Sequence, residues 1–406
     1  MLRDALRGRT VLDFTHIGAG PQCTMLLADM GATVIKVEPP EGDLGRTLGP
    51  PWIGGDSAVY HGFNRNKRGI CLDLKTEAGV AVARRLAATA DILVESMRPG
   101  VMDRLGLGYD RIAADNPGIV YCSVSAYGQT GPYAQRPGVD GILQADSGLM
   151  SIIGIPGGEP VKVQAPVVDV FTGYVAAMGV LARLLQRGGD GVGSHLDVSL
   201  FNSAIALQQV SLTSFMVDGI LPQPIGSAAP YSAPNEAFRA ADGWIMVAAY
   251  NGQRWDRLCE ALGCPELIRD PRFDSSTKRV ANRPEMRALL TDCFKRKPVS
   301  AWMEILQGVD ILCAPVADYQ TLADHPQLAA NGMVVSLDHP VLGAIRTIGF
   351  PVDSVASNGA GHAVAPDRGQ HSAAILAEAG FTPDEIAALI ADKIIKSSEP
   401  LGGAKP

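Results

Sequence analysis

Short apolar runs alternate with stretches of helical periodicity along the amino-terminal part of the chain. Four runs have the length and composition of buried strands: Val11–Phe14, Val34–Glu38, Ile92–Glu95 and Ile119–Ser123. Between them, apolar positions recur at helical spacing over Pro21–Met30 and Thr76–Ala87, and Pro21 suits the first turn of a helix. This alternation predicts an α/β fold in which helices wrap a parallel sheet.

The middle of the chain continues the pattern with more glycine. The segment Gly138–Pro160 is rich in glycine and small residues, so we expect loops around a short apolar turn. A helix is predicted over Val170–Gln186, followed by a flexible loop at Gly188–Gly193, a strand near His195–Val198 and a further helix from Leu200. Residues 1–220 are therefore predicted to form the first part of a large, Rossmann-like domain.

A smaller unit is predicted after a proline-rich linker. Gly219–Asn235 holds four prolines, which is typical of a segment that crosses between domains. Beyond it we expect a hairpin of Ala237–Arg239 with Trp244–Ala249, and helices near Arg254–Leu262, Pro284–Phe294 and Ser300–Leu306. Residues 221–315 are thus predicted to form a small α+β domain. Residues 316–406 return to the large domain, with a helix near Pro383–Ile395 and a frayed tail, Ser397–Pro406.

Composition and charge narrow the class of protein. The 406 residues exceed what one core usually serves, and 47% are apolar. The formal charge is −7 without runs of like charge, which argues against nucleic acid and anionic membranes as partners. The longest uncharged stretch, Val198–Val217, contains Asn202 and Gln208, so we expect no membrane span. Seven scattered cysteines and a charged start without a signal peptide predict a cytoplasmic protein.

The first loop has part of a dinucleotide-binding fingerprint. Gly18 and Gly20 follow the first strand, a helix comes next, and Glu38 ends the second strand where a ribose-binding acid belongs. Cys23 stands at the third glycine position, and Pro21 removes one donor from the start of the helix. Three interpretations stay open: a nicotinamide cofactor, another anion at the helix amino terminus, or no ligand.

Asp169 stands at the start of the small-residue-rich helix predicted from Val170. By residue type it is an N-cap. The same position suits a nucleophile, because the helix dipole and nearby amide donors would keep the carboxylate ionised. The sequence position alone leaves both interpretations open.

A locally basic region stands out in this acidic chain. It comprises Asn64–Arg68 and, beyond the next strand, Arg98 and Arg104 among glycine and proline. Such a region is typical of solvated surface, or of a site for a phosphate-bearing cofactor. The histidines lack metal-ligand spacing and no Gly-x-Ser-x-Gly motif occurs, which argues against zinc and serine hydrolases.

Taken together, these residues resemble the class III CoA-transferases of the CaiB/BaiF type, the family of formyl-CoA transferase and carnitine CoA-transferase. The resemblance covers nearly the whole chain. The pieces that carry it are Val11–Pro21, Gly31–Glu38, Asn64–Arg68, Arg98–Leu107, Ser147–Met150 and the helix opened by Asp169. Each piece is short, but their order and spacing agree with the family.

The resemblance implies a mechanism and an assembly. The family's catalytic aspartate falls on Asp169, which would move CoA from a small acyl-CoA, such as succinyl-CoA, to a carboxylic acid through mixed anhydride and aspartyl-CoA thioester intermediates. CoA is then a substrate, with no tightly bound cofactor and no metal. The family's interlocked homodimer would be the assembly.

The resemblance also implies where CoA binds. The positions carried over from the family's CoA site are His16, Gly18, Leu72, Lys75, Arg98, Arg104 and Tyr127. Gly138–Gly158 or Asn251–Gly252 would supply the glycine-rich loop that covers the site. Ser96 and Ser125 stand where formyl-CoA transferase has an asparagine and a lysine, so its formyl-CoA and oxalate specificity is not expected here.

Three other functions remain as alternatives. An α-methylacyl-CoA racemase needs a second proton-transfer group upstream of the aspartate, and no histidine occurs between His61 and His195. A nicotinamide-dependent oxidoreductase would use the first loop, and a catalytically silent CoA-binding protein would need no nucleophile. The sequence leaves the donor and acceptor acids and the pathway open. Asp140 and Asp146 are interpreted as turn formers.

Overall fold

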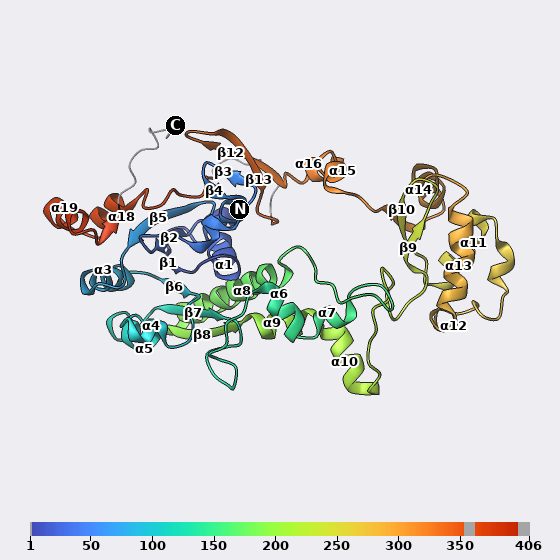
Figure 1. Cartoon of the computed structure of the whole chain (residues 1–406), viewed down its shortest axis with the longest axis horizontal. Coiled ribbons are helices and arrows are strands. Elements are labelled where there is room, and N and C mark those ends of the chain that lie inside the picture. Colours follow the sequence, from blue (N-terminus) through green and yellow to red (C-terminus); the bar gives the residue numbers. More distant parts are fainter. Residues whose placement is uncertain (1, 353–361, 397–406) are drawn as a thin grey trace. The chain divides into compact units, whose positions relative to one another are not determined.

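The computed structural model describes residues 2–352 and 362–396 (Figure 1). The chain divides into two compact units. The first comprises Met1–Leu149, Lys162–Ile220 and Pro326–Pro406, and the second comprises Met150–Val161 and Leu221–His325. Compared with the predicted division into 1–220, 221–315 and 316–406, the second unit also includes residues 150–161 and 316–325.

A seven-stranded sheet forms the centre of the first unit, in the order β14-β5-β2-β1-β6-β7-β8. Its strands are β1 Thr10–Phe14, β2 Thr33–Glu38, β5 Lys67–Leu72, β6 Ile92–Glu95, β7 Val120–Ser125, β8 Ser194–Ser199 and β14 Ile395–Lys396. All neighbours are parallel except β14, which runs antiparallel to β5. The predicted α/β class with a parallel sheet is confirmed. The strand order reverses at β1, between β2 and β6, and ligands of such sheets bind at the carboxyl ends of the strands beside this point.

Helices cover both faces of this sheet (Figure 1). On one face, α1 (Ala19–Asp29) and α8 (Val167–Asp190) pack against each other and against the strands. A Cβ on Gly173 of α8 would lie 2.4 Å from Gln22 Cγ of α1, so only glycine permits this approach. The core of the other face includes residues of α3 (Glu77–Ala87), α4 (Val101–Arg104), α5 (Tyr109–Asp115) and α18 (Ser372–Glu378), with α19 (Pro383–Ala391) packed against it.

Helix α8 is apolar enough to raise the question of a membrane. By length and composition, Val167–Gly189 could cross one, and α9 (Leu200–Leu207) with α10 (Gln209–Asp218) would count as well if this pair, bent by 72°, were one span. About a third of the α8 stretch is buried, and α8 packs on α1, β7 and β8. These contacts are those of a core helix in an α/β domain.

Shorter elements complete the first unit. Two small antiparallel pairs are formed by β3 (Trp52–Ile53) with β4 (Asp56–Ser57) and by β12 (Val334–His339) with β13 (Gly343–Ile348). The remaining helical segments are η1 Leu2–Asp4, η2 Leu44–Thr47, α2 Ala58–Phe63, α6 Asp140–Asp146 and α16 Pro326–Ala330, while α7, Leu149–Ile152, crosses the boundary into residues of the second unit.

The second unit packs helices around a three-stranded antiparallel sheet, β11-β10-β9. The predicted hairpin is confirmed as β9 (Asn235–Arg239) and β10 (Trp244–Ala248), and β11 is Leu312–Pro315. The core is aromatic, with Phe238 stacked on Phe294 at 4.9 Å between ring centroids. Its helices are α11 Gly252–Leu262, η3 Pro265–Ile268, α12 Ser276–Ala281, α13 Arg283–Phe294, α14 Val299–Gly308 and α15 Tyr319–Ala323.

The structure corrects three local predictions. The loops expected at Gly138–Pro160 contain α6 and α7, because the fully buried Leu143 and the side chain of Gln144 fix a helix that the glycine content obscured. The loop expected at Gly188–Gly193 begins later, because α8 continues until Gly191 ends it at a φ of 74°. The last helix ends at Ala391, and the predicted tail Ser397–Pro406 lies outside the described residues.

Candidate active site

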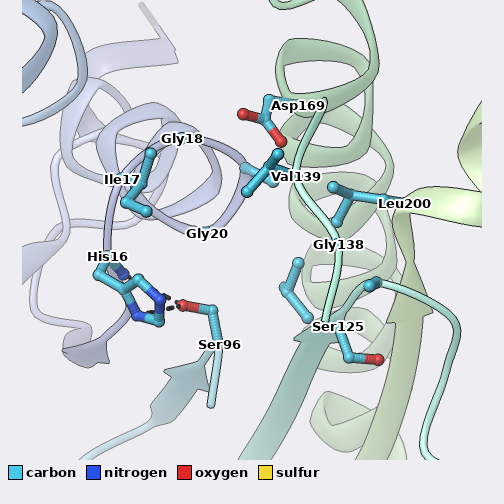
Figure 2. A pocket seen from close by; sticks show the side chains of 13 residues that line it. His16, Ile17, Gly18, Gly20, Ser96, Ser125, Gly138, Val139, Asp169 and Leu200 are labelled. Atoms are coloured by element: carbon cyan, nitrogen blue, oxygen red, sulfur yellow. Dashed lines mark hydrogen bonds between the residues drawn. The ribbon is translucent and has the colours of Figure 1, made fainter. Parts of the chain in front are cut away.

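A small cavity lies at the carboxyl edge of the sheet, where the strand order reverses (Figure 2). Its volume is about 120 Å³. The loop between β1 and α1, the end of β7 and the residue after β6 contribute its walls, together with the starts of α8 and α9. The side chains that matter for chemistry are His16, Ser96, Ser125 and Asp169. The structure thus brings the first loop and Asp169 to one site.

The carboxylate of Asp169 lies directly against the backbone of the first loop. A Cβ on Gly18 would lie 2.3 Å from Asp169 Oδ2, closer than any non-bonded contact allows. Glycine at position 18 is therefore a requirement of the site, because any side chain would displace the carboxylate. In Figure 2, Asp169 lies beside Gly18 and Val139.

The N-cap interpretation of Asp169 is wrong. The N-cap position of α8 is Pro166, and Asp169 lies in the first turn of the helix. The capping carboxylate comes from α6 instead: Asp140 Oδ2 accepts hydrogen bonds from the backbone N–H of Val168 at 2.8 Å and of Asp169 at 3.2 Å. Because Asp140 satisfies these donors, the side chain of Asp169 is left to face the cavity.

Asp140 is the residue that the sequence analysis missed. We expected a turn former, but Asp140 begins α6 and its carboxylate is bound on both oxygens. Gln144 Nε2 donates to Asp140 Oδ1 and, at 3.1 Å, to the carbonyl of Val163. The Asp-x-x-x-Gln spacing, one helical turn, was a signal that Asp140 and Gln144 interact. The backbone of Val168, which Asp140 also binds, lies 28 residues further along the chain, and no local pattern indicates that contact.

The environment of Asp169 favours its protonated form more than expected. Burial, followed by the negative charge of Asp140, raises the pKa of Asp169 from 3.8 to about 7. The expectation that the helix start keeps this carboxylate ionised is therefore wrong, since Asp140 occupies the amide donors that would have stabilised its charge. A pKa near neutrality, set by burial and a like charge, is typical of functional carboxyl groups.

His16 anchors the loop and faces away from Asp169. Its backbone N–H donates to Ser96 Oγ at 3.1 Å, and its Nδ1 lies 3.2 Å from the same oxygen. Burial lowers the pKa of His16, which favours the neutral ring. Figure 2 shows the ring directed toward Ser96, so His16 is not placed as a second proton-transfer partner of Asp169.

Two of the predicted CoA contacts lie at the end of β5 and beyond it. Leu72 is fully buried in the core and pairs with Ile395 of β14, so a contact with CoA there would use its backbone. Lys75 is exposed, with its Nζ 3.7 Å from Glu41 Oε1. Neither residue lines the cavity at Asp169, and their role in binding stays a prediction.

The remaining predicted contacts lie at neighbouring hollows. Arg98 lines a second cavity of about 340 Å³ together with Glu95, Ser123 and His195, and Ser123 Oγ lies 2.9 Å from His195 Nε2. The exposed Arg104 is beside its rim, since its Nη1 would lie 3.4 Å from a Cβ on Gly100.

Tyr127 lines a third hollow with Arg136 and Asp146, and its ring packs edge-on against Tyr133 at 5.6 Å between centroids. Of the predicted site residues, His16, Gly18 and Asp169 line the small cavity, while Arg98 and Tyr127 line two other hollows.

Metal-binding groups are absent from the part of the chain that the structure describes. Over residues 2–352 and 362–396, no cluster of three or more His, Cys, Asp or Glu side chains could hold a metal ion. All seven cysteines are free thiols.

Comparison with known proteins identifies the family. The model of CoA-transferase family III matches residues 6–372. This chain is a member of CoA-transferase family III. The resemblance seen in the sequence is thereby confirmed, and the enzyme is a CoA-transferase rather than a nicotinamide-dependent oxidoreductase.

Sequence alignments with CoA-transferases named for their substrates cover most of this family III protein. It is 36% identical over 374 residues to the human succinyl-CoA:glutarate CoA-transferase, and this alignment covers 92% of this chain and 85% of the human protein. It is 38% identical over 330 residues to the acetyl-CoA:oxalate CoA-transferase of Acetobacter aceti, with coverages of 81% and 85%. These relatives use different donors and acceptors.

Solved structures of the family share the fold. A CAIB/BAIF family protein from Brucella suis is similar with a TM-score of 0.80 at 34% identity, covering 92% of this chain and 99% of that one. The Mycobacterium tuberculosis protein Rv3272 gives a TM-score of 0.81 at 32% identity, with coverages of 91% and 98%. The architecture described above is therefore that of the CaiB/BaiF proteins.

Proposed function

We propose that this family III enzyme transfers CoA from a small acyl-CoA, such as succinyl-CoA, to a carboxylic acid, with Asp169 as the nucleophile. The observation that carries the proposal is the carboxylate of Asp169, which lies in a small cavity against the Gly18 backbone with a pKa raised to about 7. Relatives named for succinyl-CoA with glutarate or mesaconate, and for acetyl-CoA with oxalate, support a dicarboxylic acid as the acceptor.

The first half-reaction would take CoA from the donor. The ionised Asp169 attacks the thioester carbonyl, the C–S bond breaks, and a mixed anhydride forms while CoA leaves as a thiolate. The thiolate then attacks the side-chain carbonyl of Asp169, which gives an aspartyl-CoA thioester and releases the donor acid. The released carboxylate carries one oxygen that belonged to Asp169.

The second half-reaction is the reverse with a new acid. The acceptor carboxylate attacks the aspartyl-CoA thioester, which gives a second anhydride and frees the CoA thiolate again. Attack of the thiolate on the acceptor carbonyl forms the product thioester and restores the carboxylate of Asp169. Each step exchanges acyl groups of similar reactivity, so the reaction needs no external energy source or cofactor.

The walls of the cavity suit this chemistry. Oxyanions form at the attacked carbonyls, and the first-turn N–H groups of α1, including that of Gly20, have no partner within their helix. The anhydrides must be kept from water, and the apolar side chains of Val139 and Leu200 line the same cavity. The reacting carbonyls would therefore be held between the nucleophile and the start of α1.

The phosphates of CoA would bind at the neighbouring basic residues. Arg98 and Arg104 are exposed, and neither forms an ion pair among the described residues. A guanidinium without a carboxylate partner is available to a phosphate. Together with Lys75 and Tyr127, and with the backbone at His16, Gly18 and Leu72, they form the CoA site that we propose.

An interlocked homodimer in the cytoplasm completes the proposal. Helix α10 carries apolar side chains that the single chain leaves in solvent, with Met216 74% and Val217 82% exposed. Clustered apolar residues of this kind are typical of surfaces that a partner covers. Seven free thiols fit a reducing compartment.

Peptide mass spectrometry tests the proposed nucleophile. The protein is mixed with a panel of acyl-CoAs, including succinyl-CoA, and trapped with hydroxylamine or borohydride. We expect one donor to place the modification on the peptide containing Asp169, and Asp169→Asn to abolish it. Binding of CoA without any modification of Asp169 across the panel would contradict the mechanism, and proton exchange at the α-carbon in deuterated water would then become the next test.

A further inference from the structure

The loop that contacts Asp169 contains a strained backbone turn. Ile17 has a φ of 68°, a left-handed conformation that a β-branched residue rarely adopts. The N–H of Gly18 donates to the carbonyl of His16 at 3.1 Å, which closes a three-residue turn centred on Ile17. Turns of this kind with a positive central φ are rare and strained. Something outside the loop must therefore hold Ile17 in place.

The group that holds it is a buried carboxylate from another segment. Asp43 Oδ1 accepts hydrogen bonds from the N–H of Ile17 at 3.1 Å and from the N–H of Gly45 at 2.7 Å. Asp43 precedes η2, and its own N–H donates to Glu38 Oε2 at 2.8 Å. Asp43 is thereby fixed between the end of β2 and the first loop.

A buried lysine holds the second oxygen of this carboxylate. Lys36 Nζ lies 2.7 Å from Asp43 Oδ2, and the two side chains are 0% and 2% exposed. The same ammonium donates to the carbonyl of Thr15 at 3.0 Å, so it also contacts the start of the loop. Burial is the largest single influence and would raise the pKa of Asp43, but the charge and hydrogen bond of Lys36, together with the hydrogen bonds from the N–H groups of Gly45 and Ile17, lower that pKa overall. Each charge therefore depends on the other.

We propose that Asp43, held by Lys36, is a positioning residue for the reaction at Asp169. It fixes the strained turn at Ile17, and that turn places the backbone of Gly18 against the Asp169 carboxylate. The inference rests on the proposed role of Asp169 as the nucleophile. No side chain of the pair touches the carboxylate itself, so the effect would pass through the loop.

Variants of Asp43 and Ile17 together distinguish support of the Ile17 turn from the general contribution of the Asp43–Lys36 ion pair to stability. An asparagine has one acceptor oxygen, so in Asp43→Asn the ammonium of Lys36 and the N–H of Ile17 would compete for it. Glycine adopts a positive φ without strain, so in Ile17→Gly the turn no longer needs the carboxylate. We therefore expect the loss caused by Asp43→Asn to be much smaller when Ile17→Gly is also present.

Asp29 offers a matched control. It is the last residue of α1, its side chain is fully buried, and its Oδ1 accepts from Arg65 Nε at 3.0 Å. Asp29→Asn breaks a comparable buried ion pair, at the end of α1 that is remote from the first loop. If the loss of activity came from a general loss of stability, Asp29→Asn would show it too. Rescue by Ile17→Gly, by contrast, is expected for Asp43→Asn and not for Asp29→Asn.

The experiment is a double-mutant cycle on the single-turnover rate of Asp169 acylation. The probe is saturating succinyl-CoA, or whichever acyl-CoA labels the native protein, and each variant is measured below its own melting temperature. We expect Asp43→Asn to slow acylation about 10-fold or more, since misplacement by about 1 Å can cost about 100-fold. Ile17→Gly should recover most of that loss. Hydrogen exchange of the Ile17 amide should speed up in Asp43→Asn alone.

Two outcomes would overturn the inference. One is acylation in Asp43→Asn at the native rate, and the other is the same fold loss with and without Ile17→Gly. If Asp43→Asn does not fold, Ile17→Gly and Ile17→Ala are compared in the native background: the strained turn requires the glycine variant to melt higher, and a higher melting temperature for alanine contradicts it. Absence of labelling in the native protein would instead contradict the nucleophile itself.

Discussion

At the scale of single residues, the proposed chemistry depends on one carboxyl group and on a second carboxyl group that caps its helix. Asp140 binds the amide donors at the start of α8, and its charge raises the pKa of Asp169 in addition to the effect of burial. Asp169 must be ionised to attack a thioester, and its ionised fraction rises with pH. Acylation should therefore rise with pH and reach half of its maximum near pH 7.

Replacing the capping carboxylate should shift this pH dependence. In Asp140→Asn the negative charge is lost while the amide oxygen can still accept from the N–H of Val168, so the pKa of Asp169 falls. The single-turnover acylation profile should move to lower pH. Asp146→Asn, at the exposed end of the same helix, should leave the profile unchanged. Identical profiles for the native protein and Asp140→Asn would contradict the assigned role of Asp140.

The carboxyl group of Asp169, the proposed nucleophile, should also lower the stability of the fold. A carboxyl group whose pKa is raised on folding holds its proton in the native state, so stability falls as pH rises from about 4 through about 7. The cost at pH 8 is up to about 4 kcal/mol. Asp169→Asn should therefore melt higher than the native protein at pH 8, and this difference should vanish near pH 4. Thermal unfolding at both pH values measures it, and an Asp169→Asn variant less stable at pH 8 would refute the raised pKa.

At the scale of elements, the site requires the first loop to approach the start of α8 very closely. Gly18→Ala would insert a Cβ 2.3 Å from Asp169 Oδ2. We expect acylation to slow by about 100-fold or more, and the melting temperature of the variant separates this loss from a change in the fold. Gly62→Ala, where no atom lies within 4 Å of the new Cβ, is the control for kinetics and melting temperature. Acylation at the native rate in Gly18→Ala would contradict the close contact.

Most of the helices and strands could be predicted from the sequence. The strands β1, β2, β6 and β7 were predicted to within one or two residues, because buried parallel strands are nearly continuous apolar runs. The edge strand β8, which is only partly buried, was predicted to within one residue at each end. Helix α6 was missed because glycine and proline around it outweighed its short apolar periodicity. The contact of Asp140 with α8 was beyond reach, since a bond across 28 residues leaves no local pattern.

At the scale of the whole molecule, the parallel sheet explains why the site lies where it does. The strand order reverses at β1, so the β1–α1 loop and the end of β6 open onto a crevice at the carboxyl edge. The family resemblance in the sequence pointed to Asp169, His16 and Gly18, which meet there. The strain at Ile17 and the buried pair that holds it arise only when β2 lies beside β1.

The transfer of one oxygen atom tests the central claim most directly. Once a donor and acceptor pair is known, the enzyme turns over with an acceptor whose carboxylate carries a heavy-oxygen label, and the Asp169 peptide is then weighed. The mechanism predicts that Asp169 gains a labelled oxygen from the acceptor and passes it to the next molecule of released donor acid. Product formation with no label on Asp169 would contradict covalent transfer through this residue.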